Sequence, residues 1–458
     1  MSNFLFIFVA VVVTDPNEFH KVLRKEGPLP FGAVQTEWPF YEFFKEQKSP
    51  LANFFTRDEN WKKLRRFMQT DLLSPQAAKG YVPGMVEAAQ LASKGIDKNT
   101  SDLSSFMARV SFDLFSSVIF GELTNLAAGT DKDAINVEFC ETTQNALSSM
   151  IPITMSVSSL PLKKIGIKTS KYQYMEREFT RSRELAFAKV QNFRERKQRG
   201  ELTERELASY ASLAIDRQIA ARGTDECVSD QEVSEIIVLA LTAAIDTTSA
   251  LLSWCLVHLA MNPHVQEKLY QEISHNVMSN PLGPILTENA LTKTSAPYLH
   301  AIMRENHRMT PPVPISITKD NATGDVEVHG VSFTKDSFFL LDARSAGMDP
   351  IILGTDHVDA FEPERWLEDA VQERIGTPAE ILDHPLYRDP FSAGARKCPG
   401  SRVANYEALV MMSQLILDWN IAFQDADVGK YKSWRDIPYN QGLTVQPSVP
   451  PLKFEKRV

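Results

Sequence analysis

Long apolar stretches with a helical period dominate the chain, and the longest runs from Ser229 to Met261. Its middle, Ile236–Ile245, is apolar on nearly every face, which predicts a buried helix rather than a half-exposed one. Ser229 or Asp230 supplies the N-cap, and Asn262-Pro263 ends the helix. At 1.5 Å per residue the helix spans about 50 Å, enough to cross a domain. The apolar run is too short for a convincing membrane span.

Other stretches extend this pattern. Helices are expected at Tyr298–Arg308, which ends at two prolines, after Gly400, and from Trp61 onward. Val326–Leu340 and Leu443–Phe454 are predicted to be strands. The sequence therefore predicts a mainly α fold with small β-sheets.

The start of the chain is predicted to form a strand and then a short helix. The run Asn3–Val13 is apolar but too short to span a bilayer. Asp15 is a suitable N-cap, Pro16 suits the first helical position, and Glu18, three residues after the cap, completes the pattern of a helix start. Gly27 is expected to close the helix.

Composition narrows the class of protein. The 458 residues are 43% hydrophobic and 23% charged, which is typical of globular proteins. A net charge of −9 gives no support for nucleic-acid binding. No repeat or flexible linker divides the chain. The four cysteines show no paired spacing, which argues against a disulfide framework; they are Cys140, Cys227, Cys255 and Cys398.

Cys398 stands in the decapeptide FSAGARKCPG, residues 391–400, directly before a predicted helix. Backbone N–H groups and the positive end of a helix favour an ionised sulfur, which is a strong metal ligand. Gly394 suits a tight turn, and Gly400 lets the backbone approach the sulfur. Phe391 can shield the sulfur from water, and Arg396 offers a fork to an anionic group. The alternative is a buried structural cysteine.

The pattern Phe-x-x-Gly-x-Arg-x-Cys-x-Gly resembles the haem-binding loop of the cytochrome P-450 superfamily. The resemblance implies that Cys398 is the thiolate ligand of haem b (iron protoporphyrin IX). It also implies the cytochrome P-450 fold, with the long central helix over the haem. A thiolate ligand favours splitting of a bound O–O bond.

Asp246-Thr247-Thr248-Ser249 lies within the long apolar helix. A buried carboxylate costs several kcal/mol unless it is partnered. The stretch AAIDTT, residues 243–248, resembles the family's oxygen-activation motif, which implies that Asp246 and Thr247 relay protons. Ala244 departs from the usual glycine. The alternative is that Thr247 and Thr248 bond back to carbonyls one turn earlier.

Two more groups fit the resemblance. Glu305 and Arg308 share a helix face and could be an ordinary surface pair. Before Pro-Pro, however, Glu-x-x-Arg resembles the family's buried ion pair, with Arg365 as the third member of a structural triad. Trp61 and Arg65 resemble the pair that contacts the haem propionates, together with Arg396. The alternative is a solvated basic stripe.

One further basic residue usual in the family is missing after Pro312. Lys319 is the candidate replacement, or one propionate lacks that anchor.

Four segments are expected to line a substrate pocket, and core packing is the alternative for each. The aromatic-rich stretch Gly27–Lys48 matches a variable loop, and Met150–Thr169 matches a roof or a membrane-facing access loop. Pro312–Ile315 and Tyr439–Leu443 would complete the pocket. Together they favour an apolar substrate.

The resemblance implies a haem-thiolate monooxygenase that inserts one oxygen atom from O2 into a lipophilic substrate such as a sterol, steroid or fatty acid. Arg402 and Arg304 resemble a basic docking surface, which favours a ferredoxin-type electron donor over a diflavin reductase. Two alternatives stay open: a haem-thiolate isomerase or dehydratase that needs no O2, and a non-enzymatic haem-binding or sensor protein.

All the matched motifs must meet at one haem, so residues 1–458 are expected to form a single catalytic domain. The chain resembles the family from a point inside its usual fold, so an N-terminal anchor, hinge and first helix are expected to be missing. Peripheral contact with a membrane is expected, in the mitochondrion or the endoplasmic reticulum, with the mitochondrion favoured.

Overall fold

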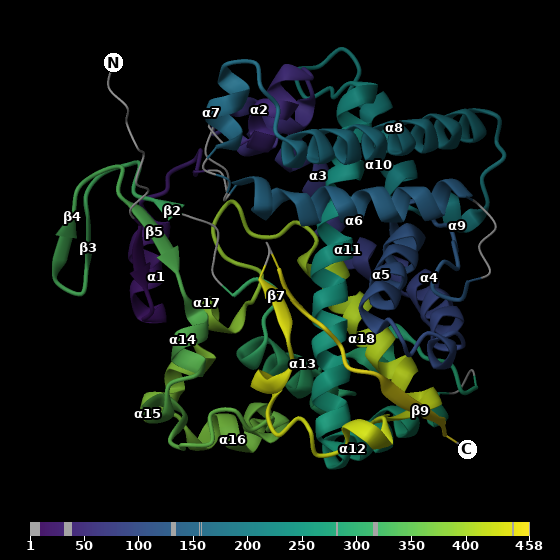
Figure 1. The fold of residues 1–458 in the computed structure, drawn as a ribbon, viewed down its shortest axis with the longest axis vertical. Helices are drawn as coiled ribbons and strands as arrows, with labels where there is room; N and C mark the ends of the chain where they lie inside the picture. Colours follow the sequence, from purple (N-terminus) through teal and green to yellow (C-terminus); the bar gives the residue numbers. More distant parts are fainter. Residues whose placement is uncertain are drawn as a thin grey trace.

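Helices make up most of the protein, and small sheets lie among them (Figure 1). The structure is a computed structural model that describes residues 10–31, 39–129, 134–154, 156, 158–280, 283–314, 319–441 and 444–457. The helix α11 (Asp230–Met261) runs through the middle of the molecule, with other helices around it. The predicted fold class, mainly α with small β-sheets, is confirmed.

The other α-helices of the described chain differ widely in length. In chain order they are α1 (Pro16–Leu23), α2 (Pro39–Glu46), α3 (Glu59–Leu72), α4 (Pro75–Ser93), α5 (Leu103–Ile119), α6 (Ala134–Thr154), α7 (Ser159–Lys164), α8 (Ser170–Gln198), α9 (Glu204–Leu207), α10 (Tyr210–Ala220), α12 (Pro263–Met278), α13 (Pro297–Met309), α14 (Ala343–Gly347), α15 (Pro350–Leu353), α16 (Glu368–Glu373), α17 (Pro385–Arg388) and α18 (Ser401–Asp418).

The strands are short and form small sheets. They are β1 (Val11–Val13), β2 (Lys319–Asp320), β3 (Val326–Val328), β4 (Val331–Phe333), β5 (Phe338–Leu341), β6 (Trp419–Phe423), β7 (Tyr439–Gln441), β8 (Val445–Pro447) and β9 (Leu452–Lys456). The three-stranded sheet has the order β1-β5-β2, and the remaining pairs are β3-β4, β6-β9 and β7-β8.

The caps of α11 explain where this helix begins and ends. Ser229 and Glu232 form a reciprocal capping box, and Asn262 ends the helix before Pro263 opens α12. By length and composition α11 could cross a membrane, but 72% of its most apolar window is buried inside the protein. It is therefore the core helix that the sequence predicts.

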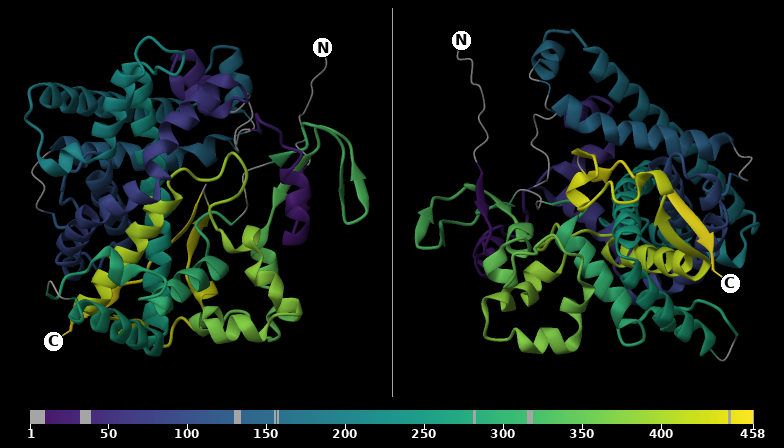
Figure 2. Two further views of the ribbon diagram at one scale, coloured as in Figure 1. Left: turned by 180° about the vertical axis from the view of Figure 1, so that it is seen from behind. Right: turned by 60° about the horizontal axis from the view of Figure 1, so that its bottom comes forward.

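Several helices pack against α11 and fix it in place. They include α5, α8 and α18, and Figure 2 shows α18 running beside α11. Trp254 and Leu256 on α11 are fully buried. Because α18 begins three residues after Cys398, this packing ties the cysteine loop to the central helix.

The N-terminal strand and helix form as expected within the described residues. Val11 pairs in parallel with Phe339 of β5, more than three hundred positions later in the chain. The Asp15 side chain caps α1, and Pro16 is its first residue. A turn follows at Gly27, where φ is +76° and a Cβ would lie 2.7 Å from Thr323 Cγ2.

One expectation about local structure is wrong in part. Residues 150–169 are not mainly a loop, because α6 continues to Thr154 and α7 follows. Pro161 lies in the first turn of α7, where no intrahelical N–H is needed, so it does not break the helix. The stretch Leu443–Phe454 contains β8 and most of β9, which confirms the strands predicted there. Trp38, Ile315 and Leu443 of the expected pocket segments lie outside the described residues.

Candidate active site around Cys398

The loop that carries Cys398 closes on itself before α18. The Cys398 N–H donates to the Phe391 carbonyl at 3.0 Å, and the Lys397 N–H donates to the Gly394 carbonyl at 3.1 Å. Gly394 has φ +80°, and a Cβ there would lie 2.6 Å from Glu26 Oε2. This position therefore needs glycine for both its backbone conformation and its close contact.

Cys398 is half-buried, and opposing effects act on the pKa of its thiol. Burial raises the pKa, whereas the Gly400 N–H and the Arg65 guanidinium lower it, and the net shift is upward. The sequence suggested an easily ionised sulfur, but burial outweighs the N–H groups near the helix start. A bound metal cation deprotonates a coordinating thiol outright, so the raised pKa does not oppose ligation.

Trp61, Arg65 and Arg396 meet at this loop. The Arg396 guanidinium lies 4.1 Å from the Trp61 ring centroid and donates to the carbonyls of Pro30, Phe54 and Thr56. Arg65 donates to the Lys397 carbonyl and, at 3.0 Å, to Gln69. In this arrangement Arg396 braces the loop through backbone acceptors. Its contact with a propionate stays a prediction.

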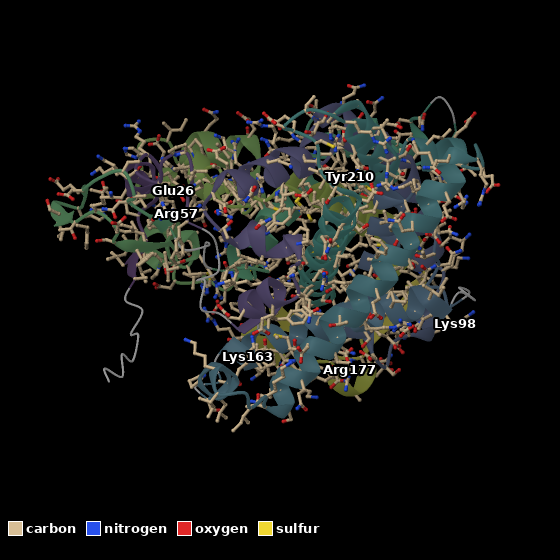
Figure 3. The ribbon with its side chains drawn as sticks, turned by 90° about the horizontal axis from the view of Figure 1, so that it is seen from above. Glu26, Arg57, Lys98, Lys163, Arg177 and Tyr210 are labelled. Atoms are coloured by element: carbon tan, nitrogen blue, oxygen red, sulfur yellow. The ribbon has the colours of Figure 1, made fainter. Side chains whose placement is uncertain are left out.

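Lys319, the candidate for the missing basic residue, lies against the Cys398 loop. Its ammonium is buried, 3.4 Å from Glu26 Oε1, and donates to the Ala393 carbonyl at 3.0 Å. Next to it in the chain, Asp320 pairs with Arg57 at 2.5 Å, and Glu26 and Arg57 (both labelled in Figure 3) are charges that act on Arg396. Lys319 therefore binds the loop to the segment that follows α1, and its contact with a propionate stays a prediction.

The middle of α11 has one open face. Of the described residues from Val233 to Ala260, only Ala243 is exposed, and Ala244, Asp246 and Thr247 beside it are half-buried. An exposed alanine in the middle of a mostly buried helix shows that this face of α11 is open to solvent. This is where the sequence places the acid and the alcohol.

One hydroxyl group near Asp246 bonds to a main-chain carbonyl of its own helix, and two bond to carboxylates. Thr247 Oγ1 donates back to the Ala243 carbonyl at 2.9 Å, as the structural alternative expected. Thr248 does not, since its Oγ1 donates to Glu407 Oε2 at 3.1 Å. Asp246 Oδ2 accepts from Thr444 Oγ1 at 2.5 Å. Burial raises the pKa of Asp246, and the Thr444 hydrogen bond opposes that shift.

Glu407 and Thr444 are polar residues of this region that sequence reasoning missed. Glu407 on α18 is 1% exposed, burial raises its pKa to about 8, and its Oε1 has no partner among the described residues. A glutamate inside the apolar run of α18 was a signal that could have identified it. Nothing local in the sequence marks Thr444, because its partner is 198 positions away.

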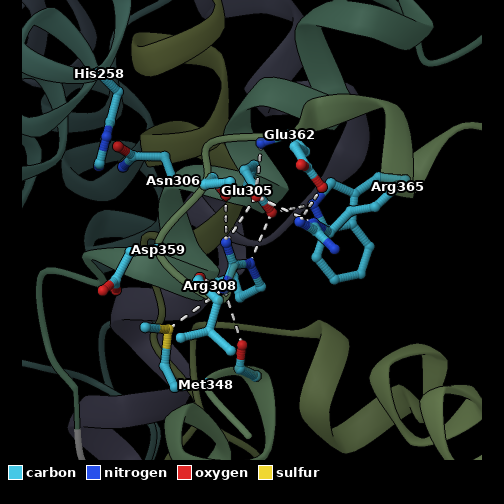
Figure 4. A network of polar contacts seen from close by, with 12 residues as sticks. His258, Glu305, Asn306, Arg308, Met348, Asp359, Glu362 and Arg365 are labelled. Carbon is cyan, nitrogen blue, oxygen red and sulfur yellow. Dashed lines mark hydrogen bonds and ion pairs between the residues drawn. The ribbon is translucent and has the colours of Figure 1, made fainter. Parts of the chain in front are cut away.

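Glu305 and Arg308 on α13 meet Arg365 in one network of polar contacts (Figure 4). Arg308 donates to both oxygens of Glu305 at 2.8 Å, and both side chains are fully buried. Arg365 Nε donates to Glu305 Oε1 at 3.1 Å. Trp366, which sequence reasoning missed, donates through Nε1 to Glu305 Oε2 at 2.9 Å. Each carboxylate oxygen of Glu305 thus accepts two of these hydrogen bonds.

The two arginines expected on a docking surface differ in availability. Arg402 is exposed and has no ion-pair partner among the described residues. The Arg304 guanidinium lies 4.1 Å from the ring centroid of Trp366 and donates to Asp383 at 3.3 Å and to the Leu382 carbonyl. Arg304 is therefore part of the internal packing, whereas Arg402 can reach a partner.

The donor set fits a haem. A half-buried thiol accepts an N–H at the start of α18, Arg396 and Trp61 lie at its loop, and α11 has a solvent-exposed face at Ala243. A flat macrocycle with one thiolate ligand matches these features, whereas no cluster of metal-binding side chains that could hold a bare ion occurs in the described residues.

Comparison with known proteins agrees with this geometry. The family model described as cytochrome P450 matches residues 8–441. The chain is 24% identical over 421 residues to the mitochondrial sterol 26-hydroxylase of Rattus norvegicus, which covers 90% of this chain and 74% of the relative. It is also 24% identical over 424 residues to cytochrome P450 76C1 of Arabidopsis thaliana, covering 90% and 77%. The chain belongs to the cytochrome P-450 family of monooxygenases, whose cofactor is haem b.

Proposed function

We propose that this monooxygenase oxidises a lipophilic substrate of the sterol, steroid or fatty acid class, as a single catalytic domain. The observation that carries the proposal is the open face of α11, where Asp246 and Thr247 lie beside the exposed Ala243 in a mostly buried helix. The apolar composition of the expected pocket segments and the relationship to a sterol hydroxylase support the substrate class.

The reaction takes up O2, two electrons and two protons, inserts one oxygen atom into a C–H bond and releases the other as water. When bound, haem supplies the iron that activates O2, and Cys398 would hold it as thiolate ligand. Trp61, Arg65 and Arg396 would stand at its propionate side.

The chain's own contribution to the chemistry is proton delivery. Asp246 has a pKa raised by burial, so its carboxyl can hold a proton nearer to neutral pH than an exposed aspartate can. Thr247 receives that proton once its hydroxyl turns away from the Ala243 carbonyl toward the open face of α11. Supply of protons at this face keeps oxygen reduction coupled to substrate oxidation, which the O2-independent isomerase alternative does not require.

Reconstitution tests the proposed function. Purified protein is loaded with haem and given NADPH, a [2Fe–2S] ferredoxin and its reductase, with cholesterol and laurate as probe substrates. Hydroxylated product that depends on O2 and NADPH supports the proposal. Normal haem binding without NADPH consumption would favour the sensor alternative, and a diflavin reductase in place of the ferredoxin tests the donor.

We propose a ferredoxin-type donor that docks near the exposed Arg402. Replacing Arg402 with Glu removes an attraction to an acidic ferredoxin and adds a repulsion. We expect the KM for ferredoxin to rise about three- to tenfold, with little change in kcat at saturation. The measurement is the ferredoxin dependence of NADPH oxidation at low and high salt, because added salt should shrink the difference.

Lys335→Glu is the matched control, because Lys335 is a likewise exposed basic residue beyond β4 on the projecting β3-β4 hairpin. An equal rise in KM for both variants would mean that only net charge matters, and the docking site would then lie elsewhere.

We also propose peripheral membrane contact, with a mitochondrial location favoured by the relationship to mitochondrial sterol 26-hydroxylase. After α7, Ile165 and Ile167 are 71% and 53% exposed, and exposed Lys164 and Lys168 flank them. Apolar tips with adjacent lysines suit an anionic lipid surface. Replacing both isoleucines with Asp should weaken binding to cardiolipin-containing liposomes about tenfold in sedimentation assays. Unchanged binding would rule this segment out.

A further inference from the structure

Among the described residues, a single polar side chain forms a hydrogen bond with the Asp246 carboxyl. Thr444 donates its hydroxyl to Asp246 Oδ2 at 2.5 Å, and Thr444 is 4% exposed. Buried acids in proteins are commonly balanced by a cation, yet only burial and Thr444 act on this group. The hydroxyl therefore takes the place that a basic residue would otherwise fill.

The hydroxyls next to Asp246 in the sequence do not form hydrogen bonds with its carboxyl. Thr247 donates to the Ala243 carbonyl, and Thr248 donates to Glu407. Ser249 Oγ donates at 3.0 Å to the Asp246 main-chain carbonyl, not to its carboxyl. Thr444, from the far end of the chain, is thus the hydroxyl that sets the orientation of the acid.

Thr444 is held in place by its neighbours rather than by Asp246. The Val445 N–H donates to the Pro312 carbonyl at 2.9 Å, and the Val445 carbonyl accepts from Trp254 Nε1 at 2.9 Å. Trp254 is fully buried on α11, eight residues after Asp246 and on a nearby face. The helix therefore contacts two consecutive residues, Thr444 and Val445, and the hydroxyl is presented to the carboxyl from a fixed backbone.

We propose that Thr444 is a positioning residue for proton delivery, which holds the Asp246 carboxyl oriented so that it can pass protons to Thr247. This inference rests on the proposed function of Asp246. Without the hydroxyl, the carboxyl loses its partner and its fixed orientation. Proton transfer from Asp246 to Thr247 then becomes slower. O2 takes up two electrons and two protons and leaves as hydrogen peroxide instead of oxidising the substrate.

The variants Thr444→Val and Thr444→Ser separate the hydroxyl from the shape of the side chain. Valine keeps the size and loses the hydrogen bond, whereas serine keeps the hydroxyl. In the reconstituted system with cholesterol or laurate, we expect Thr444→Val to lower product formed per NADPH consumed about five- to tenfold, with peroxide rising to match. Thr444→Ser should retain most of the coupling. Both should keep the CO-bound reduced spectrum of the wild type.

The Asp246→Asn background distinguishes failure of this inference from failure of the proposed function. If Asp246→Asn uncouples the enzyme but Thr444→Val does not, Thr444 has no positioning role and the proton relay stands. If Asp246→Asn leaves coupling unchanged, the relay and the inference both fail. If Thr444→Ser is as uncoupled as Thr444→Val, the hydroxyl does not restore coupling by itself, which also overturns the inference.

A second readout does not depend on turnover. Infrared difference spectra identify the Asp246 carboxyl band by its loss in Asp246→Asn. Thr444→Val should shift that band, because a hydrogen bond to the carboxyl is removed, and Thr444→Ser should leave it in place. An unshifted band in Thr444→Val would overturn the inference even if neither probe substrate is oxidised.

Discussion

Replacing Glu305 with Gln should destabilise the protein by about 3–5 kcal/mol, the usual cost of breaking a buried ion network. Glu305 accepts from Arg308, Arg365 and Trp366, and Arg308 is fully buried. The neutral amide would leave the Arg308 charge uncompensated in the core. Urea unfolding of the purified variant measures the loss, and a lower haem content should accompany it.

Glu362→Gln is the matched control, because it neutralises another carboxylate bonded to Arg365. Glu362 pairs with Arg365 at 2.7 Å, but its side chain is 54% exposed. Exposed pairs contribute about 1 kcal/mol or less, so this variant should remain near wild-type stability. Similar losses in both variants, or a Glu305→Gln protein within about 1 kcal/mol of wild type, would contradict the scaffold role proposed for the network.

The second large effect is expected in catalysis. Among the described residues, Asp246→Asn removes the only titratable side chain on the open face of α11, and it should lower the rate of product formation about a hundredfold, as is typical for loss of a positioned acid. Electrons should still be consumed, with peroxide as the product. Parallel measurements of NADPH, peroxide and hydroxylated product reveal the change.

Ser249→Ala provides the comparison for Asp246→Asn. Ser249 neighbours Asp246 but bonds to its main-chain carbonyl, so this variant should stay coupled. Thr247→Ala should uncouple the enzyme in the same direction as Asp246→Asn. Full coupling in Asp246→Asn or Thr247→Ala would remove that residue from the relay.

Local signals in the sequence were enough to predict where the helices that build the site begin and end. The capping residues at Ser229 and Asp15 and the prolines at 263 and 311 mark real boundaries, since they act within one turn of the chain. The loop around Cys398 could be predicted because its glycines, arginine and cysteine are fixed by short spacing. The segment 150–169 was harder, because a proline in a first turn resembles a helix breaker.

Contacts between distant residues could not be read from the sequence. The partner of Asp246 lies 198 positions away, and that of Lys319 lies just after α1. Arg396 binds carbonyls of the segments before α3, which no side-chain pattern encodes. For the same reason Arg304 resembled a surface charge, although Trp366 and Asp383 hold it inside the protein.

The central claim is that Cys398 supplies the thiolate ligand of the haem, and the CO-bound spectrum of the reduced protein tests it most directly. The wild type should show the red-shifted Soret band that thiolate ligation produces. Cys398→Ser should bind CO without that shift or lose haem, whereas Cys255→Ser, a change at a buried cysteine on α11, should keep the shift. A red-shifted band that persists in Cys398→Ser, or one missing from wild-type protein that has bound haem, would contradict the account.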